Sequence, residues 1–173
     1  MKNKILLFLM IVFSFTLTAC KKKEERPLSE NEYYVYYINT ATDKLVENRY
    51  TASLPSNDMD GLVDELMSQF LKVPDDLEAL SALPDKVTYQ GFDRDGNILY
   101  LNFDTNYQGM DISREVLARA ALAKTLTQID GIDYISIRCG DQPLFNALGE
   151  NVGLISSSNF INSISNVNSF EKA

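Results

Sequence analysis

The sequence predicts an α+β fold, with a small mixed sheet and two main helices packed on one of its faces. Segments with strand character and segments with helical periodicity are mixed along the chain, in the order strand, strand, helix, strand, strand, helix, strand. Two pairs of neighbouring strands are joined by short turn-forming stretches, which favours antiparallel hairpins. The 173 residues show no internal repeat, so we expect a single domain.

The first hairpin begins with a strongly aromatic strand. Residues 32–38 contain four tyrosines together with Val35 and Ile38, and such side chains suit a pleated, half-buried surface. Residues 39–43 have turn chemistry. Residues 45–51 therefore predict a second strand, antiparallel to the first.

The first helix follows Ser56 and Asn57, which can cap its N-terminus, and Pro74 ends it. Residues 75–80 predict a further short helical turn. Apolar residues recur in the helix at intervals of three and four, which places six of them on one face: Leu62, Val63, Leu66, Met67, Phe70 and Leu71.

The second hairpin joins strands at residues 86–92 and 97–104. The turn is Asp93-Arg94-Asp95-Gly96-Asn97, in which Gly96 can adopt a positive φ. Alternation along the second strand predicts one face formed by Leu99, Leu101 and Phe103.

The second helix spans residues 111–129 and is the clearest in the sequence. Ser113 is its expected N-cap, and Ile112 is expected to pack on Leu117 as a hydrophobic staple. Gly131 ends the helix, and residues 132–139 form the last strand. One apolar stripe runs along the helix, made of Ala118, Leu122, Leu126 and Ile129.

The N-terminus has the pattern of a bacterial lipoprotein signal. Lys2 and Lys4 precede an apolar run from Ile5 to Phe15, which suits a signal peptide and is too short for a comfortable membrane span. Leu17-Thr18-Ala19-Cys20 then resembles a lipobox, in which the Cys20 thiol receives lipid and the chain is cut before it. An ordinary secretory signal with an incidental cysteine is the alternative.

The expected boundaries follow from this signal. Residues 1–19 are the lipoprotein signal peptide, residues 20–31 a charged tether, and residues 32–148 the folded domain. The Asn/Ser-rich C-terminal tail covers residues 149–173, and its apolar residues leave open whether part of it docks on the body. Three lysines, 21–23, follow Cys20 directly and would assist attachment to anionic lipid.

The second cysteine, Cys139, cannot form an intramolecular disulfide if Cys20 carries lipid. Cys139 shares the alternation of Ile135 and Ile137, which predicts a buried and unreactive thiol.

The charge balance argues against nucleic acid as a partner. Removal of residues 1–19 takes away Lys2 and Lys4, so 14 basic residues remain against 24 acidic ones and the net charge falls from −8 to −10. Such a surface repels phosphate backbones.

The chain contains no histidine, which excludes Ser–His–Asp and Cys–His arrangements and the usual zinc sites. Asp93-x-Asp95-Gly96-Asn97 and Asp58-x-Asp60-Gly61 faintly resemble calcium loops. Both lack the full ligand set, and a hairpin turn and a helix start explain them better. We therefore expect no enzyme activity, no metal and no cofactor.

The tyrosines of the first strand suggest a binding surface. Alternation places Tyr33 and Tyr37 on one face and Tyr34 and Tyr36 on the other. One pair belongs to the core. The other pair, for which Tyr34 and Tyr36 are the candidates, either packs under the tail or forms an exposed surface for protein or glycan.

In the order of its segments the chain, from Tyr33 to Leu148, resembles the GerMN domain of bacterial envelope lipoproteins that serve sporulation and spore germination. The segments that carry the resemblance are Tyr34-Val35-Tyr36-Tyr37, Leu62–Leu66, Ala82-Leu83-Pro84, Ile98–Asp104 and Lys124–Ile137. The resemblance implies a fold like that of ring-building domains and a non-enzymatic role in envelope assemblies. It brings no catalytic residues.

Two functions follow as expectations. The first is a lipid-anchored interaction module on the outer face of the cell membrane, which meets envelope proteins or a second copy of itself and serves spore formation or germination. The second is a ligand-binding lipoprotein that recognises cell-wall glycan through the tyrosines and the tail.

Overall fold

The computed structural model describes residues 26–160. The lipobox with Cys20, the lysines 21–23 and the end of the tail lie outside these residues. The described strands form two sheets, one in the order β2-β1-β3 and the other in the order β4-β5-β6-β7. The α+β class is confirmed, and the strands divide between two sheets where we expected one.

Strands and helices are mixed along the chain, as the sequence predicts. Their bounds are β1 (Glu32–Asn39), β2 (Leu45–Thr51), α2 (Met59–Phe70), β3 (Ala79–Leu80), β4 (Tyr89–Asp95), β5 (Ile98–Phe103), η1 (Tyr107–Gly109), α3 (Ile112–Leu126), β6 (Tyr134–Cys139), β7 (Gln142–Pro143) and η2 (Ser157–Asn159).

The first sheet is built on the predicted hairpin. β1 and β2 pair antiparallel, with Glu32 opposite Thr51 and Ile38 opposite Leu45. The helical turn expected at residues 75–80 is wrong, because Ala79 and Leu80 form β3 and pair with the end of β1. A strand of two residues is too short to show periodicity in the sequence.

The second sheet combines a hairpin with a crossover. β4 and β5 pair antiparallel, with a bulge between Tyr89 and Gly91, and Gly96 in their turn has the expected positive φ, 59°. β6 lies parallel to β5, because α3 carries the chain back between them. β7 then pairs antiparallel with β6.

Both helices are capped by an aspartate instead of the residues we expected. Asp58 caps α2 by accepting a hydrogen bond from the Gly61 N–H at 3.1 Å. Leu71 follows the last turn of α2 and is 40% exposed, whereas the other five apolar residues predicted for its buried face are buried.

Asp111 caps α3 through the N–H groups of Ser113 and Arg114. Ile112 is therefore the first residue inside the helix and is 64% exposed. The predicted staple against Leu117 is wrong, since a staple residue must precede the cap.

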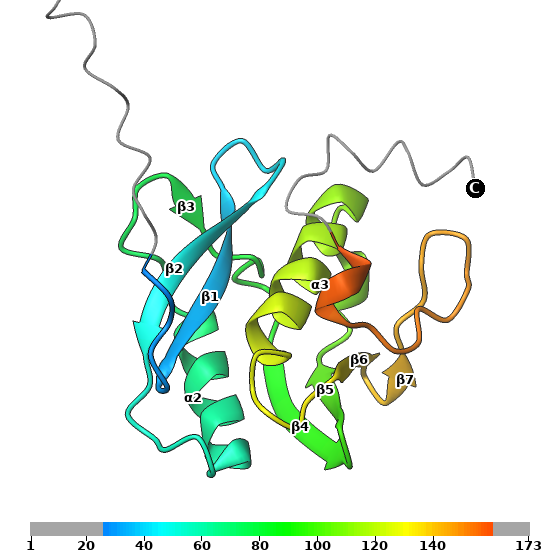
Figure 1. Cartoon of the computed structure of the whole chain (residues 1–173). Coiled ribbons are helices and arrows are strands. Elements are labelled where there is room, and N and C mark those ends of the chain that lie inside the picture. The colour runs from blue at the N-terminus through cyan, green and yellow to red at the C-terminus, as the bar shows by residue number, and fades with distance from the viewer. Residues whose placement is uncertain (1–25, 161–173) are drawn as a thin grey trace, which may run out of the picture.

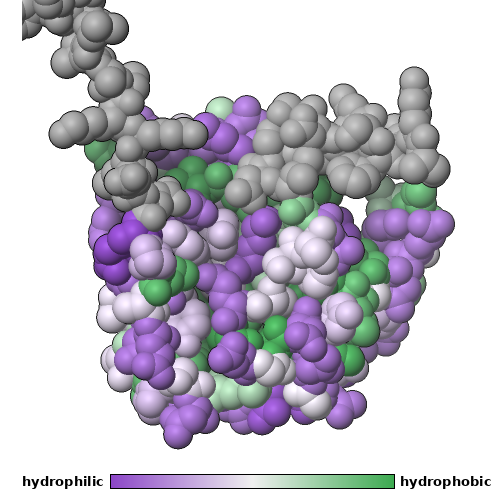
Figure 2. Space-filling model, viewed as in Figure 1, coloured by the Kyte–Doolittle hydropathy of each residue, from purple (hydrophilic) through white to green (hydrophobic). Residues whose placement is uncertain are grey.

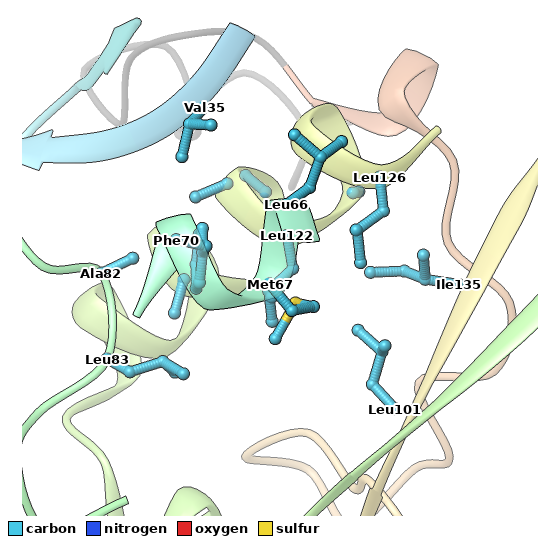
Figure 3. Packing of buried hydrophobic residues seen from close by; sticks show 14 of the residues in the cluster. Val35, Leu66, Met67, Phe70, Ala82, Leu83, Leu101, Leu122, Leu126 and Ile135 are labelled. Carbon is cyan, nitrogen blue, oxygen red and sulfur yellow. The ribbon is translucent and has the colours of Figure 1, made fainter. Parts of the chain in front are cut away.

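The core lies where α2 and the two sheets meet α3. Figure 1 shows α3 between the β1–β2 hairpin and the second sheet, and Figure 3 shows α2 side chains directed at Leu122 and Leu126. Alanines let the sheets approach α3 closely. Its buried residues lie on nearly every side, namely Leu117, Ala118, Ala120, Ala121, Leu122, Ala123, Thr125 and Leu126.

The first part of the Asn/Ser-rich tail packs on the second sheet. Ile155 exchanges two backbone hydrogen bonds with Ile135, both of 2.8 Å, and is 3% exposed. Phe160 packs partly against the core, while Leu154 is exposed.

Candidate interaction surface

Strand β1 presents one tyrosine pair to the core and the other outward. Tyr33 and Tyr37 are buried, and the Tyr37 hydroxyl donates to the Gln69 carbonyl of α2 at 3.0 Å. Tyr34 and Tyr36 are half-buried on the opposite face. The expectation that one pair is core is confirmed, and a binding role for the other pair stays a prediction.

The outward pair forms a row of two neighbouring rings with a cation at each end. The Tyr34 and Tyr36 rings lie 6.3 Å apart between centroids. The Arg49 guanidinium lies 5.6 Å from the centre of the Tyr34 ring, and the Lys124 ammonium lies 5.8 Å from that of Tyr36. These distances allow cation–π attraction. We call Arg49, Tyr34, Tyr36 and Lys124 the tyrosine row.

Two side chains of the α3 C-terminal region hold the backbone under this row. The Gln128 amide accepts from the Tyr34 N–H at 2.9 Å and donates to the Tyr34 carbonyl at 2.7 Å, as a neighbouring strand would. The Thr125 hydroxyl accepts from the Tyr36 N–H at 3.1 Å. The row therefore sits on a fixed strand.

Gln128 and Thr125 are not among the residues that the sequence pattern predicts for this surface. The signal that could have found them is their spacing, three residues apart at the end of an apolar helix. Thr125 is fully buried, and a buried hydroxyl requires a hydrogen-bond partner.

A cavity of about 780 Å³ adjoins Tyr34 and is also lined by Arg26, Arg49 and Lys72. Arg26 makes two hydrogen bonds to the Glu32 carboxylate, of 2.6 and 2.5 Å. These bonds lower the pKa of Glu32 to about 2, so the carboxylate stays charged and partly neutralises the cations. The cavity, whose lining also includes Tyr37, thus offers donors, acceptors and two tyrosine side chains to a polar ligand or a peptide.

The surface shown in Figure 2 is mixed in character. Hydrophilic and intermediate residues cover most of this face, and hydrophobic residues appear between them as smaller patches. A partner on this face would therefore meet polar groups beside apolar ones, as is typical of non-obligate interfaces.

Three carboxylates of the calcium-like segments bind protein groups. Asp58 caps α2, Asp60 accepts from Arg94 at 2.7 Å, and Asp93 accepts from Arg138 at 3.1 Å. Within residues 26–160, no cluster of three or more His, Cys, Asp or Glu side chains could hold a metal ion.

Cys139 is a free cysteine, buried on β6 beside Ile135 and Ile137 as predicted. Burial raises the pKa of its thiol to about 11. At neutral pH the sulfur is therefore protonated and weakly nucleophilic.

Two sheets around a central helix, with an aromatic row on the middle strand of the first sheet, define a small α+β module that presents a surface. The chain belongs to the Germane family, described as sporulation and spore germination, whose model matches residues 34–145. The resemblance to the GerMN domain is thereby confirmed.

Two solved structures from Bacillus subtilis share the fold. The tandem GerMN domains of the sporulation protein GerM align with a TM-score of 0.55 and 17% identity, over 75% of this chain and 47% of that one. The first GerMN domain of GerM aligns with a TM-score of 0.53 and 14% identity, over 69% and 91%. This chain thus spans about half of the tandem structure. A comparison with curated proteins gives no match.

Across residues 26–160, no helix is both long and apolar enough to cross a membrane.

Proposed function

We propose that this protein is a lipid-anchored, extracytoplasmic interaction module that supports an envelope complex during spore formation or germination. The observation that carries the proposal is the family match over residues 34–145, because the family is described by those two processes. The role is non-enzymatic. It consists of holding partner proteins at the outer face of the cell membrane.

The anchor is Cys20, which closes the lipobox Leu17-Thr18-Ala19-Cys20. The lysines 21–23 strengthen this anchor by about 1 kcal/mol each against anionic lipid.

The partner-binding surface is the tyrosine row. Tyrosine and arginine are enriched among residues that dominate binding energy, since they combine large contact area with hydrogen bonding. The backbone of Tyr34 and Tyr36 is already ordered by β1 and by the Gln128 and Thr125 bonds. Binding therefore costs little additional backbone ordering.

The biological test is deletion of the gene in a spore-forming host, followed by counting heat-resistant spores that germinate. We expect a sharp loss that the wild-type chain restores and Cys20→Ala does not. Normal spore yield and germination after deletion would overturn the link to this process.

The molecular test is crosslinking of the full chain in cells, with Tyr34→Ala and Tyr36→Ala together as the variant. We expect the wild type to trap envelope proteins and the variant to lose them. Tyr100→Ala is the matched control, because Tyr100 also stacks on an arginine, with Arg138 at 4.3 Å, but lies on the second sheet. Equal capture of envelope proteins by the wild type and the double variant would show that the tyrosine row does not bind the partner.

A second candidate is recognition of cell-wall glycan, favoured by the cavity beside Tyr34 with its mixed polar lining. Purified peptidoglycan should then bind the full chain and lose binding with the same double variant. Absence of binding would exclude glycan recognition and leave protein interaction as the proposed function.

A further inference from the structure

Strand β2 forms an outer edge of the first sheet, in the order β2-β1-β3. Tyr34 and Tyr36 of β1 turn their N–H groups away from β2, toward Gln128 and Thr125. The residues opposite them, Arg49 and Glu47, must turn theirs the other way, because opposed residues of an antiparallel pair share their orientation.

The backbone groups of Glu47 and Arg49 therefore face outward from the sheet. Among the residues described, no other strand pairs with this edge. Space lies beside it, since residues 47–49 line the cavity of about 780 Å³ together with Arg26 and with Lys72 to Asp75.

The β2 edge lacks the usual protection against strand addition. Edge strands are commonly blunted by bulges, prolines, lysines or like charges. β4, at the edge of the second sheet, has a bulge between Tyr89 and Gly91 and carries two aspartates, Asp93 and Asp95. β2, with the sequence LVENRYT, has no bulge, and its two charges are opposite in sign.

These charges make the strand complementary to itself. In an antiparallel pair centred on Asn48, Glu47 of one copy lies opposite Arg49 of the other. Val46 likewise lies opposite Tyr50. Opposite-charge pairs and aromatic–β-branched pairs are both favourable across strands. In this register Glu47 of one copy and Arg49 of the other exchange backbone hydrogen bonds. This agrees with the outward direction of their backbone groups.

We propose that the free edge of β2 pairs with β2 of a second copy of this chain, antiparallel and centred on Asn48. The contact is small and therefore weak in dilute solution. Anchoring in one membrane raises the effective concentration and makes it significant. In this respect the inference rests on the proposed function, and it names self-association as one part of that function.

The test places a cysteine at the two-fold centre of the pair. Asn48 opposes itself at a non-hydrogen-bonded position, where a disulfide between strands fits. The full chain with Asn48→Cys is expressed in cells, and the membranes are treated with copper phenanthroline. We expect disulfide-linked dimers in clear excess over the unsubstituted chain.

Thr51→Cys is the matched control, since Thr51 is exposed on the same strand. In the proposed register the two Thr51 residues lie about 20 Å apart, too far for a disulfide. Equal dimer yields for the two variants, or no dimer with Asn48→Cys, would overturn the register.

Charge variants in the Asn48→Cys chain test the pairing itself. Glu47→Arg should reduce the dimer yield several-fold, because arginines then face each other. Addition of Arg49→Glu should restore it. Glu78→Arg makes the same charge change at an exposed position outside β2 and should leave the yield unchanged. A loss with Glu78→Arg equal to that with Glu47→Arg would refute the specific pair.

This experiment fails independently of the proposed function. If Asn48→Cys gives no dimer while Tyr34-dependent capture of envelope proteins persists, self-pairing is wrong and the interaction role stands. If Asn48→Cys gives dimers but no envelope protein is captured, self-pairing stands and the proposed interaction role is wrong.

Discussion

Glu65 concentrates hydrogen bonds at the junction of α2 with the end of β2. Its carboxylate accepts from the Tyr50 hydroxyl at 2.7 Å, the Ser53 N–H at 2.7 Å, the Ser53 hydroxyl at 2.8 Å and the Leu54 N–H at 3.1 Å. Burial alone would raise its pKa, but these bonds lower the pKa to about 2. The charged form is therefore the one that stabilises the fold.

Glu65→Gln keeps the shape of the side chain and removes its charge. The donors that bind the carboxylate in the wild type then face an amide, which has only one acceptor oxygen. We expect the free energy of unfolding at pH 7 to fall by about 2 kcal/mol. The Glu65 contribution is present above its ordinary pKa of 4.5 and is lost as pH falls through about 2. The difference in free energy of unfolding between wild type and variant should thus be smaller at low pH.

Urea denaturation followed by circular dichroism, at pH 7 and at pH 2.5, measures the difference in free energy of unfolding between wild type and Glu65→Gln. Glu78→Gln, at an exposed carboxylate, serves as the control and should change little at either pH. An undiminished difference at pH 2.5 would show that Glu65 acts through packing and not through its charge.

At the scale of elements, α3 closes the edge of β1 that β3 leaves open. Gln128 bonds both backbone groups of Tyr34 and so takes the place of a neighbouring strand. Because Tyr34 belongs to the tyrosine row, the helix end also sets the geometry of the candidate surface.

Gln128→Ala should leave the Tyr34 N–H and carbonyl without their protein partner. We expect a loss of about 1–2 kcal/mol in stability and faster hydrogen exchange at the Tyr34 amide. Exchange monitored by NMR provides an internal control, because the Tyr33 amide on the same strand faces β2. Equal acceleration at both amides would indicate global destabilisation in place of local opening.

The sequence predicted elements better than their ends and partners. Apolar periodicity located α2 and α3, but the caps are two aspartates, Asp58 and Asp111, that the sequence did not single out. Several neighbouring polar residues could cap these helices, and the path of the preceding loop decides among them. The two-residue strand β3 carries no periodic signal at all.

The candidate surface shows the same division between local and long-range information. Alternation separated Tyr34 and Tyr36 from the buried Tyr33 and Tyr37. The bonds from Gln128 join residues 94 positions apart, and local patterns do not encode such contacts.

At the scale of the molecule, α3 unites two sheets that share no strand. The alanines Ala120, Ala121 and Ala123 are buried, so the helix is covered on several sides, whereas the sequence predicts one apolar stripe. A helix with one stripe predicts one sheet, and a helix covered all round can hold two. This difference explains why the division into two sheets escaped the sequence analysis.

If α3 is the common support, a cavity in it should weaken both sheets together. Leu122 is fully buried between them, and Leu122→Ala should cost about 3 kcal/mol. Where exchange requires global unfolding, this loss accelerates it about a hundredfold. Amides of β1 and of β5 should therefore gain the same factor in native-state hydrogen exchange, while Leu148→Ala, at a side chain 82% exposed, should change neither. Acceleration confined to one sheet would show that the sheets unfold separately and that α3 is not their common support.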